Sequence, residues 1–370
     1  MTRRFLLGAF ASVALLTMAG AVTTAARAQT SYSFRDLGTL GGTYSNAQSV
    51  NTSGQVVGYA FRPGGTTFGR DEHAFYWASG VMTDLGTLGG TWAQAFAINN
   101  AGDVVGRSQI AAPGNTTRAF LWNNTSRVLT DLNTYLSVAD AANWVLRSAA
   151  GINDNRQVTG EGEVSIDGVV YAHAYLLDLN TGFLTDLGTL PGSADSYGFG
   201  LNNLASPQVV GKSGVPFLYD SAAFALLDLS PLWEARGINN AGQIVGAVNP
   251  SGSGPAHPAY RAPDGTITDL GTFTSNSYAG GRAYGINNAF PAFVVGKADT
   301  VVKNTLLPRA FRWRVGSAAK DNLNTLASNR GTFTLRSANA VSDNGSIVGT
   351  ANNTKNEPSN YDRAFLLTPQ

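Results

Sequence analysis

The chain contains no cysteine, and that absence excludes disulfide frameworks, thiolate metal sites and cysteine nucleophiles. Charged residues are scarce, at 13% against the roughly 25% usual in soluble domains, and the 25 basic groups nearly cancel the 24 acidic ones. A net charge this close to zero does not indicate the basic surface typical of nucleic-acid binding, so no nucleic-acid partner is expected. Catalytic signatures are also missing, because neither a G-x-S-x-G elbow nor a Walker-type phosphate loop occurs.

Long apolar runs are confined to the beginning of the chain. Two arginines precede the mostly apolar range 5–22, and Ala-Arg-Ala at 26–28 supplies the small residues that signal peptidase reads. We therefore expect a secretory signal peptide over 1–28, cleaved before Gln29, and a secreted chain, extracellular or periplasmic, without a transmembrane segment. A transmembrane helix is the alternative, disfavoured by glycines and polar residues within the run. A twin-arginine signal is also disfavoured, because phenylalanine follows the arginine pair directly.

Glycine is abundant instead, at 43 residues, and much of it belongs to an internal repeat. The string Asp-Leu-Gly-Thr-Leu occurs at 36–40, 84–88 and 186–190, with variants at 131–135, 228–232, 269–273 and 322–326. Each copy is followed by an apolar-Asn pair or its relic: Val50-Asn51, Ile98-Asn99, Ile152-Asn153, Leu201-Asn202, Ile238-Asn239, Ile286-Asn287 and Val341-Ser342. A short apolar segment ending in glycine comes next, and then an aromatic segment. The unit therefore occurs seven times, about once every 50 residues.

Each unit is expected to form four short strands, as at 95–99, 103–106, 119–122 and 81–85, because short apolar runs are bounded by Gly, Asn and Pro. Four strands in such a repeat predict a β-propeller blade. An open solenoid is the alternative, and the chain ends distinguish the two. The range 32–37 is a fourth strand without its blade, whereas 363–367 is a third strand without its fourth. We therefore expect an all-β, seven-bladed β-propeller over 29–370, closed by pairing of the N-terminal and C-terminal strands.

The aromatic segments carry a resemblance to a known family. His73-Ala74-Phe75 is intact, and altered copies stand at 173–175, 216–217, 309–311 and 363–365. Together with the Asp-Leu-Gly-Thr-Leu string and the apolar-Asn pair, these tripeptides resemble the HAF repeats of bacterial extracellular proteins over essentially all of 32–370. The resemblance implies an exported or surface-associated repeat protein. It brings no established catalytic activity.

The residues that usually carry chemistry occupy repeat positions. His73, His173 and His257 stand at the same or nearly the same position in three blades, so ring symmetry keeps them too far apart to share a metal. The recurring aspartates are expected to make hydrogen bonds within blades: Asp36, Asp84, Asp131, Asp186, Asp228 and Asp269. Glu161 and Glu163 share a strand face as half of a possible carboxylate pair, with a solvated edge as the preferred interpretation. We expect no catalytic residues, metal or cofactor, although a weak calcium site at a turn stays an alternative.

Loop lengths indicate where a ligand would bind. The connection from the Asp-Leu strand to the apolar-Asn strand varies in length, and so does the one between second and third strands, and in a propeller both emerge on one face. Every connection of the first kind carries an aromatic residue that could stack on a ligand. The candidate ligand-binding residues are Tyr44, Trp92, Trp144, Tyr197, Trp233, Tyr278 and Phe333, together with Arg147 and Arg336 of two similar longer connections. The alternative is that the aromatics pack between blades and the arginines link them.

The leading functional hypothesis is a secreted, monomeric, non-enzymatic binding propeller whose variable-loop face engages a polysaccharide or a protein. The first alternative is a carbohydrate-active enzyme, a glycosidase or lyase, which would need two carboxylates, or a histidine with an acid, on the central loop face. The second is a purely structural surface protein, which a large exposed apolar patch would favour.

Overall fold

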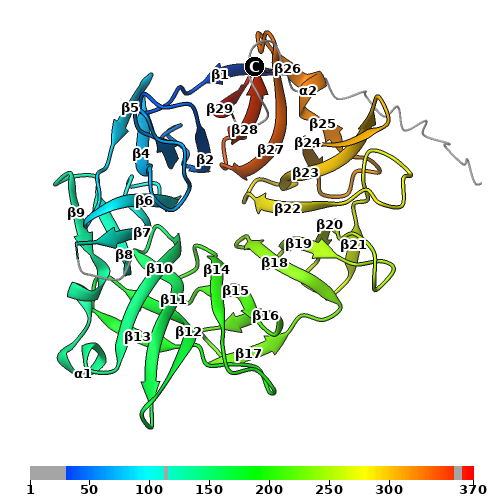
Figure 1. Cartoon of the computed structure of the whole chain (residues 1–370). Coiled ribbons are helices and arrows are strands. Elements are labelled where there is room, and N and C mark those ends of the chain that lie inside the picture. The colour runs from blue at the N-terminus through cyan, green and yellow to red at the C-terminus, as the bar shows by residue number, and fades with distance from the viewer. Residues whose placement is uncertain (1–30, 112–115, 354–360) are drawn as a thin grey trace, which may run out of the picture.

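The computed structural model describes residues 31–111, 116–353 and 361–370, so the signal peptide expected at 1–28 lies outside the described residues. Seven sheets, each with four antiparallel strands, are arranged as blades around a central axis (Figure 1). The predicted all-β, seven-bladed propeller is therefore confirmed. Helix is limited in this part of the chain to three single turns: η1 (Leu132–Tyr135), α1 (Val138–Ala141) and α2 (Leu323–Leu326). None of these described helices has the length and apolarity needed to cross a membrane.

Each blade has its strands in chain order from the axis outward, apart from the last one. The innermost strands are β2 (Ser45–Val50), β6 (Gly89–Ile98), β10 (Trp144–Ile152), β14 (Tyr197–Leu201), β18 (Leu232–Ile238), β22 (Gly281–Ile286) and β27 (Phe333–Val341). The second strands are β3 (Val56–Phe61), β7 (Val104–Ile110), β11 (Gln157–Ile166), β15 (Gln208–Ser213), β19 (Ile244–Val248), β23 (Phe293–Val302) and β28 (Ile347–Asn353). The third strands are β4 (Glu72–Ala78), β8 (Thr117–Asn123), β12 (Val169–Asp178), β16 (Val215–Asp220), β20 (His257–Arg261), β24 (Thr305–Arg314) and β29 (Asp362–Pro369). The outer strands are β5 (Val81–Asp84), β9 (Val128–Asp131), β13 (Phe183–Asp186), β17 (Ala225–Asp228), β21 (Ile267–Asp269), β25 (Asp321–Asn322) and β1 (Tyr32–Asp36).

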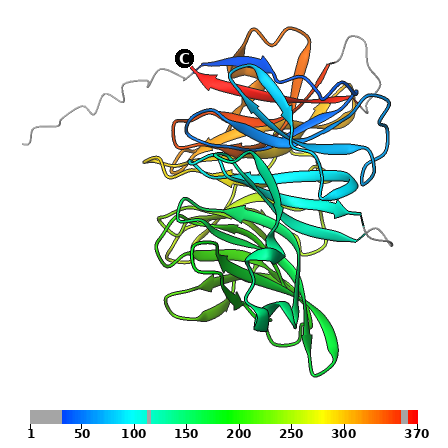
Figure 2. The same cartoon turned by 90° about the vertical axis from the view of Figure 1, so that its left-hand side faces the viewer.

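The last blade joins the two ends of the chain. Strand β1 pairs antiparallel with β29 over five residue pairs, from Tyr32 opposite Pro369 to Asp36 opposite Phe365. Figure 2 shows the blue and red strands side by side at the top of the ring. A fifth strand, β26 (Ala327–Ser328), adds to the outside of β1 in parallel, which the four-strand pattern did not predict. The predicted closure by the terminal strands is confirmed.

The core lies between blades rather than inside any one of them. Six aromatic rings on third strands are fully buried: Phe75, Phe120, Tyr175, Phe217, Phe311 and Phe365. Each packs in a cluster that draws residues from adjacent blades, as where Leu121 of β8 meets Leu146 of β10. Because a single four-stranded blade cannot bury both of its faces, stability depends on the neighbouring blades.

The repeated aspartates hold the outer edge of each blade. The backbone N–H two residues after each aspartate donates to its carboxylate, at 2.8 Å from Gly86 to Asp84 and at 2.8 Å from Gly188 to Asp186. The same carboxylate contacts the histidine on the third strand, with His73 Nδ1 2.8 Å from Asp84. Equivalent pairs join His173 to Asp186 and His257 to Asp269, both at 2.9 Å. The predicted hydrogen bonds of the aspartates within blades are therefore confirmed.

A glycine on every second strand lies against the backbone of the innermost strand. A Cβ added at any of them would overlap the carbonyl oxygen opposite: this holds for Gly58, Gly106, Gly160, Gly211, Gly246, Gly296 and Gly349. The oxygen belongs in each case to the residue four places before the apolar residue of the apolar-Asn pair, such as Asn46 for Gly58 and Gln94 for Gly106. The repeated glycine is thus required by close backbone approach.

That close approach accompanies a β-bulge in every innermost strand. In β6, Ala95 pairs with Gly106 and Ala97 with Val105, which leaves Phe96 without a partner. The register shifts at the equivalent place in all seven blades, and the unpaired residues are Gln48, Phe96, Ala150, Phe199, Arg236, Tyr284 and Asn339. A bulge bends its strand and redirects the side chain of the extra residue.

Candidate functional site

The bulged residues converge on the axis of the ring. All seven line a cavity of about 900 Å³ at one end of the axis. Six of the seven residues two places earlier line it as well: Asn46, Ser148, Tyr197, Glu234, Arg282 and Ser337. The seventh, Gln94, is buried and bonds to Glu72 and Arg107 instead. Two repeat positions on the innermost strands therefore account for most of the cavity wall.

A third repeat position completes the wall, namely the residue after the close-packed glycine on the second strand. Arg107, Glu161, Lys297 and Thr350 reach the cavity from this position. Because seven equivalent positions carry such different side chains, the fold is symmetric while the cavity surface is not. Its lining mixes aromatic rings, amides, hydroxyls, three carboxylates and four cations. Such a mixture is typical of sites that orient a polar ligand.

One carboxylate of the cavity neutralises two arginines. Glu234 accepts a hydrogen bond from Arg236 Nε at 3.2 Å and one from Arg282 Nε at 3.0 Å. Burial disfavours ionisation of this carboxyl, but the two guanidinium groups outweigh it and hold the pKa of Glu234 below its usual value. The guanidinium of Arg236 also lies 4.7 Å from the ring centroid of Phe199. Strands β14, β18 and β22 thus contribute to one connected group.

In the other two carboxylates of the cavity, the effect of burial on the pKa outweighs that of the neighbouring cations. Burial raises the pKa of Glu161, and the positive charge of Arg107 opposes that shift only in part. Burial also raises the pKa of Asp362, against the effect of its ion pair with Arg336 at 3.4 Å. Within the residues that the structure describes, Glu161 makes no hydrogen bond or ion pair through its carboxylate. These two groups therefore differ from Glu234 in their protonation chemistry.

The aromatics predicted from the loops are dispersed. Tyr44 and Tyr197 line the cavity, so the structure brings two of the seven to it. Trp92 and Trp144 are buried, and the ring of Phe333 packs 5.2 Å from Phe34. Trp233 and Tyr278 are 53% and 80% exposed and are not among the lining residues. A ligand-binding role for each of them stays a prediction.

The two predicted arginines bond to groups on other strands. Arg147 bonds to Glu163 and to the carbonyl oxygen of Thr117 in the preceding blade. Arg336 bonds to Asp362, which itself lines the cavity. The similar sequences around the two arginines reflect a shared structure. The side-chain amide of Asn133 bonds to the backbone N–H and C=O of Leu146, and that of Asn324 bonds in the same way to Leu335. Neither arginine lines the cavity directly.

Three cavity aromatics escaped the sequence analysis: Phe96, Phe199 and Tyr284. They lie two places before the apolar residue of the apolar-Asn pair, inside the innermost strand rather than in a connection. The signal that could have found them is the repeat position itself, which is occupied by a different residue in every blade except for two phenylalanines. Strict strand alternation does not reveal it, because the bulge adds a residue.

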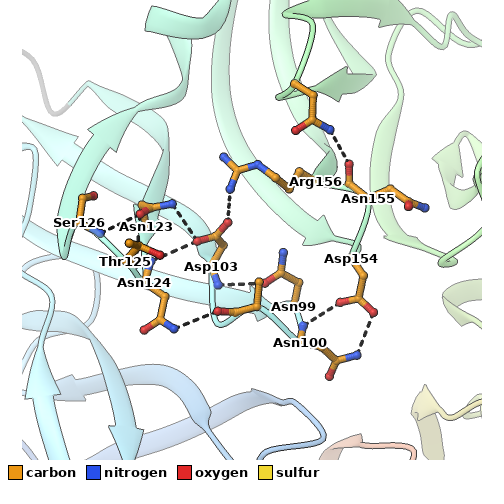
Figure 3. A network of polar contacts seen from close by, with 12 residues as sticks. Asn99, Asn100, Asp103, Asn123, Asn124, Thr125, Ser126, Asp154, Asn155 and Arg156 are labelled. Atoms are coloured by element: carbon orange, nitrogen blue, oxygen red, sulfur yellow. Dashed lines mark hydrogen bonds and ion pairs between the residues drawn. The ribbon is translucent and has the colours of Figure 1, made fainter.

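A smaller hollow of about 190 Å³ is lined by the apolar-Asn pairs and the residues that follow them. The asparagine of each apolar-Asn pair donates to a carbonyl oxygen in the next blade, as from Asn99 to Asn153 at 3.2 Å. A second belt runs beside it, in which Asn100 N–H donates to Asp154 at 2.7 Å (Figure 3). Figure 3 also shows Arg156 bonding to Asp103 across the same pair of blades. These residues have inter-blade partners, so we assign them to ring assembly.

Groupings suited to a metal ion do not occur among residues 31–111, 116–353 and 361–370, where no three His, Cys, Asp or Glu side chains cluster. The histidines instead pair with aspartates of their own blades.

Comparison with known proteins gives a family and a set of structures similar in fold. A family described as "Protein of unknown function (DUF3466)" has a model that matches residues 90–365. No curated protein matches the chain in sequence. An oligogalacturonate lyase in complex with manganese has a TM-score of 0.54 and 11% identity over 92% of this chain and 96% of that one. An oligogalacturonate lyase from Vibrio parahaemolyticus also has a TM-score of 0.54, with 9% identity over 91% of this chain and 97% of that one.

A third structure, TolB from Acinetobacter baumannii, has a TM-score of 0.43 and 13% identity, and the match spans 72% of this chain and 65% of that one. The likeness to the two lyases is one of fold alone at such identities.

Proposed function

The chain belongs to the DUF3466 family of proteins of unknown function, and from this premise we propose that its central cavity binds a saccharide chain without transforming it. The observation that carries the proposal is the set of bulged residues. Seven equivalent positions point into one cavity, and they present two phenylalanines, a tyrosine, an arginine, two amides and an alanine. Packing between blades explains the residues that every blade shares. It does not explain why the side chains at these seven positions differ.

The lining has the two kinds of group that sugar rings need. Aromatic faces stack on the apolar face of a pyranose, and amides and charged groups bond to its hydroxyls. Phe96 and Phe199 supply rings on two blades, and Asn46, Gln48 and Asn339 supply amides on two others. A volume of about 900 Å³ accommodates several sugar units. We therefore put the ligand in the cavity at the end of the axis.

Export is expected from the sequence and fits this role. The signal peptide expected at 1–28 and the resemblance to HAF repeats both favour a chain that acts outside the cytoplasm, where polysaccharides are available. A protein ligand is the other candidate for the same cavity.

A carbohydrate-active enzyme is a second candidate, and one observation favours it. Three carboxylates line the cavity, and burial raises the pKa of two of them, Glu161 and Asp362. A raised pKa suits a general acid. Release of reducing ends from saccharides by the wild type, lost in Glu161→Gln, would replace the binding proposal with this one.

The test of the binding proposal is a broad glycan array with three proteins. We expect the wild type to bind a defined set of glycans and Phe199→Ala to lose them, because the stacking face is removed. Tyr278→Ala is the matched control, since Tyr278 is an exposed aromatic outside the cavity lining. A blank array for the wild type, or equal loss in both variants, would contradict binding of saccharides in the cavity.

A further inference from the structure

Positive charge is in surplus on one side of the cavity. Arg236 on β18, Arg282 on β22 and Lys297 on β23 all line it there. Glu234 is the carboxylate that contacts this group, and it is already shared by the two arginines. Three cations therefore face one anion in two neighbouring blades.

Lys297 lies where its charge is least compensated. It is the direct cross-strand partner of Arg282, and like charges in that relation repel each other. Among the described residues Lys297 has no hydrogen bond or ion pair, and Glu234 is occupied by Arg236 and Arg282. One carboxylate for three cations leaves a surplus of positive charge beside Lys297, and this surplus favours an anion from outside.

Aromatic surface adjoins these cations. The ring of Phe199 lies against the guanidinium of Arg236, and Tyr284 stands at the bulge of β22, two residues after Arg282. A ligand group that combines a ring with an apolar face and a negative charge would satisfy both features. Arginine forks match the planar, two-oxygen geometry of a carboxylate.

We propose that this side of the cavity is a subsite for the carboxylate of a uronic acid within the bound saccharide, anchored by Lys297, Arg282 and Arg236. The inference rests on the proposed function and adds to it the chemical class of the ligand. Glu161 on β11 and Asp362 on β29 belong to other blades than the three cations.

The experiment is a calorimetric titration with a panel of uronate oligomers made of galacturonate, mannuronate or glucuronate units. Each oligomer is compared with its methyl ester, which has the same sugar units but no negative charge. We expect at least one acid to bind about tenfold or more tightly than its ester, since a charge-assisted hydrogen bond is lost in the ester. Lys297→Gln should remove most of that difference, because it should weaken binding of the acid much more than binding of the ester.

Lys212→Gln is the matched control. Lys212 occupies the same repeat position on β15, after the close-packed Gly211, but it is exposed and does not line the cavity. It should leave the preference for the acid intact, and thermal melts should show that both variants fold. Arg236→Gln is the second test variant and should also reduce the preference.

The outcomes separate this inference from the proposed function. Equal binding of acids and esters, or binding of neutral glycans alone on the array, would overturn the uronate subsite and leave saccharide binding in place. Binding of a sulfated galactan in place of every uronate would also overturn it. An acid preference that survives in Lys297→Gln and Arg236→Gln would put the carboxylate elsewhere. A blank array together with blank titrations would remove both proposals.

Discussion

At the scale of single residues, the repeat preserves the groups that the backbone needs and varies those that face the cavity. The second-strand glycine is present in all seven blades because the innermost strand comes too close for any Cβ. The aspartate of the outer strand is present in six, because it bonds to the turn that follows and to the third-strand histidine where one is present. Neither residue lines the cavity, so both are repeated because the fold of each blade requires them.

Gly106→Ala tests the packing argument. The new methyl group would overlap the carbonyl oxygen of Gln94, and a backbone group cannot move away as a side chain tip can. We expect a loss of about 3 kcal/mol or more in the free energy of unfolding, at the upper end for overpacking. Gly168→Ala is the control, since Gly168 has open space around it and a positive φ, and should cost roughly 1 kcal/mol. Chemical denaturation measures both, and equal losses would contradict the account.

Asp84→Asn tests the electrostatic part of the same motif. Burial disfavours ionisation, but the hydrogen bonds from His73 and from the Gly86 backbone outweigh it, so the pKa of Asp84 lies below its ordinary value. A lowered pKa contributes stability that is present above the unfolded pKa and is lost as pH falls through the folded one. The wild type should therefore exceed Asp84→Asn in stability at neutral pH, and the difference should shrink below about pH 4. A difference that is constant down to pH 3 would contradict it.

At the scale of elements, the bulge in the innermost strand decides where side chains point. It occurs at one place in all seven strands, immediately before a small or hydroxyl residue that faces the next blade. At Gly285 a Cβ would come within 3.1 Å of Ala340 Cα, so the strands meet closely around the axis there. The bulged residue turns toward the cavity as a result.

Asn133→Ala tests how the two longer connections are held. The amide of Asn133 accepts from Leu146 N–H at 2.8 Å and donates to Leu146 O at 3.1 Å, which fixes η1 against the start of β10. Removing it should cost about 1–3 kcal/mol of unfolding free energy, because two backbone groups lose their partner. Asn324→Ala should have a similar effect through Leu335. Thr125→Ala, at an exposed turn position, should be nearly neutral; comparable losses in all three would contradict the assignment.

Element by element, the sequence predicted the four strands of each blade because their signals are local and repeated. It predicted Tyr44 and Tyr197 of the cavity lining but missed Phe96 and Phe199, since these two reach the cavity only through a bulge that depends on the approach of the neighbouring strand. The aromatics chosen instead stand four to eight residues before the apolar-Asn pair, and of these Tyr197 alone has the offset of the lining position. Strand β26 also could not be predicted, because two residues carry no pattern.

At the scale of the whole molecule, closure of the ring joins residues more than three hundred positions apart. Strand β1 completes the last blade, and Tyr32 Oη accepts a hydrogen bond from Arg312 Nη1 of the blade before it at 3.0 Å. Removing residues 31–36 should lower the thermal midpoint and expose the edge of β29 to aggregation. Tyr32→Phe keeps the strand and should cost only about 1 kcal/mol. A truncated chain as stable as Tyr32→Phe would show that the ring does not depend on β1.

The central claim is that the cavity at the end of the axis, lined by the bulged residues, is the binding site. A crystal structure with a glycan selected on the array tests it most directly. The account predicts sugar density in the cavity, with a ring on Phe199 or Phe96 and an acidic group near Lys297. Density at the exposed Trp233 or Tyr278, with the cavity filled by solvent, would contradict it.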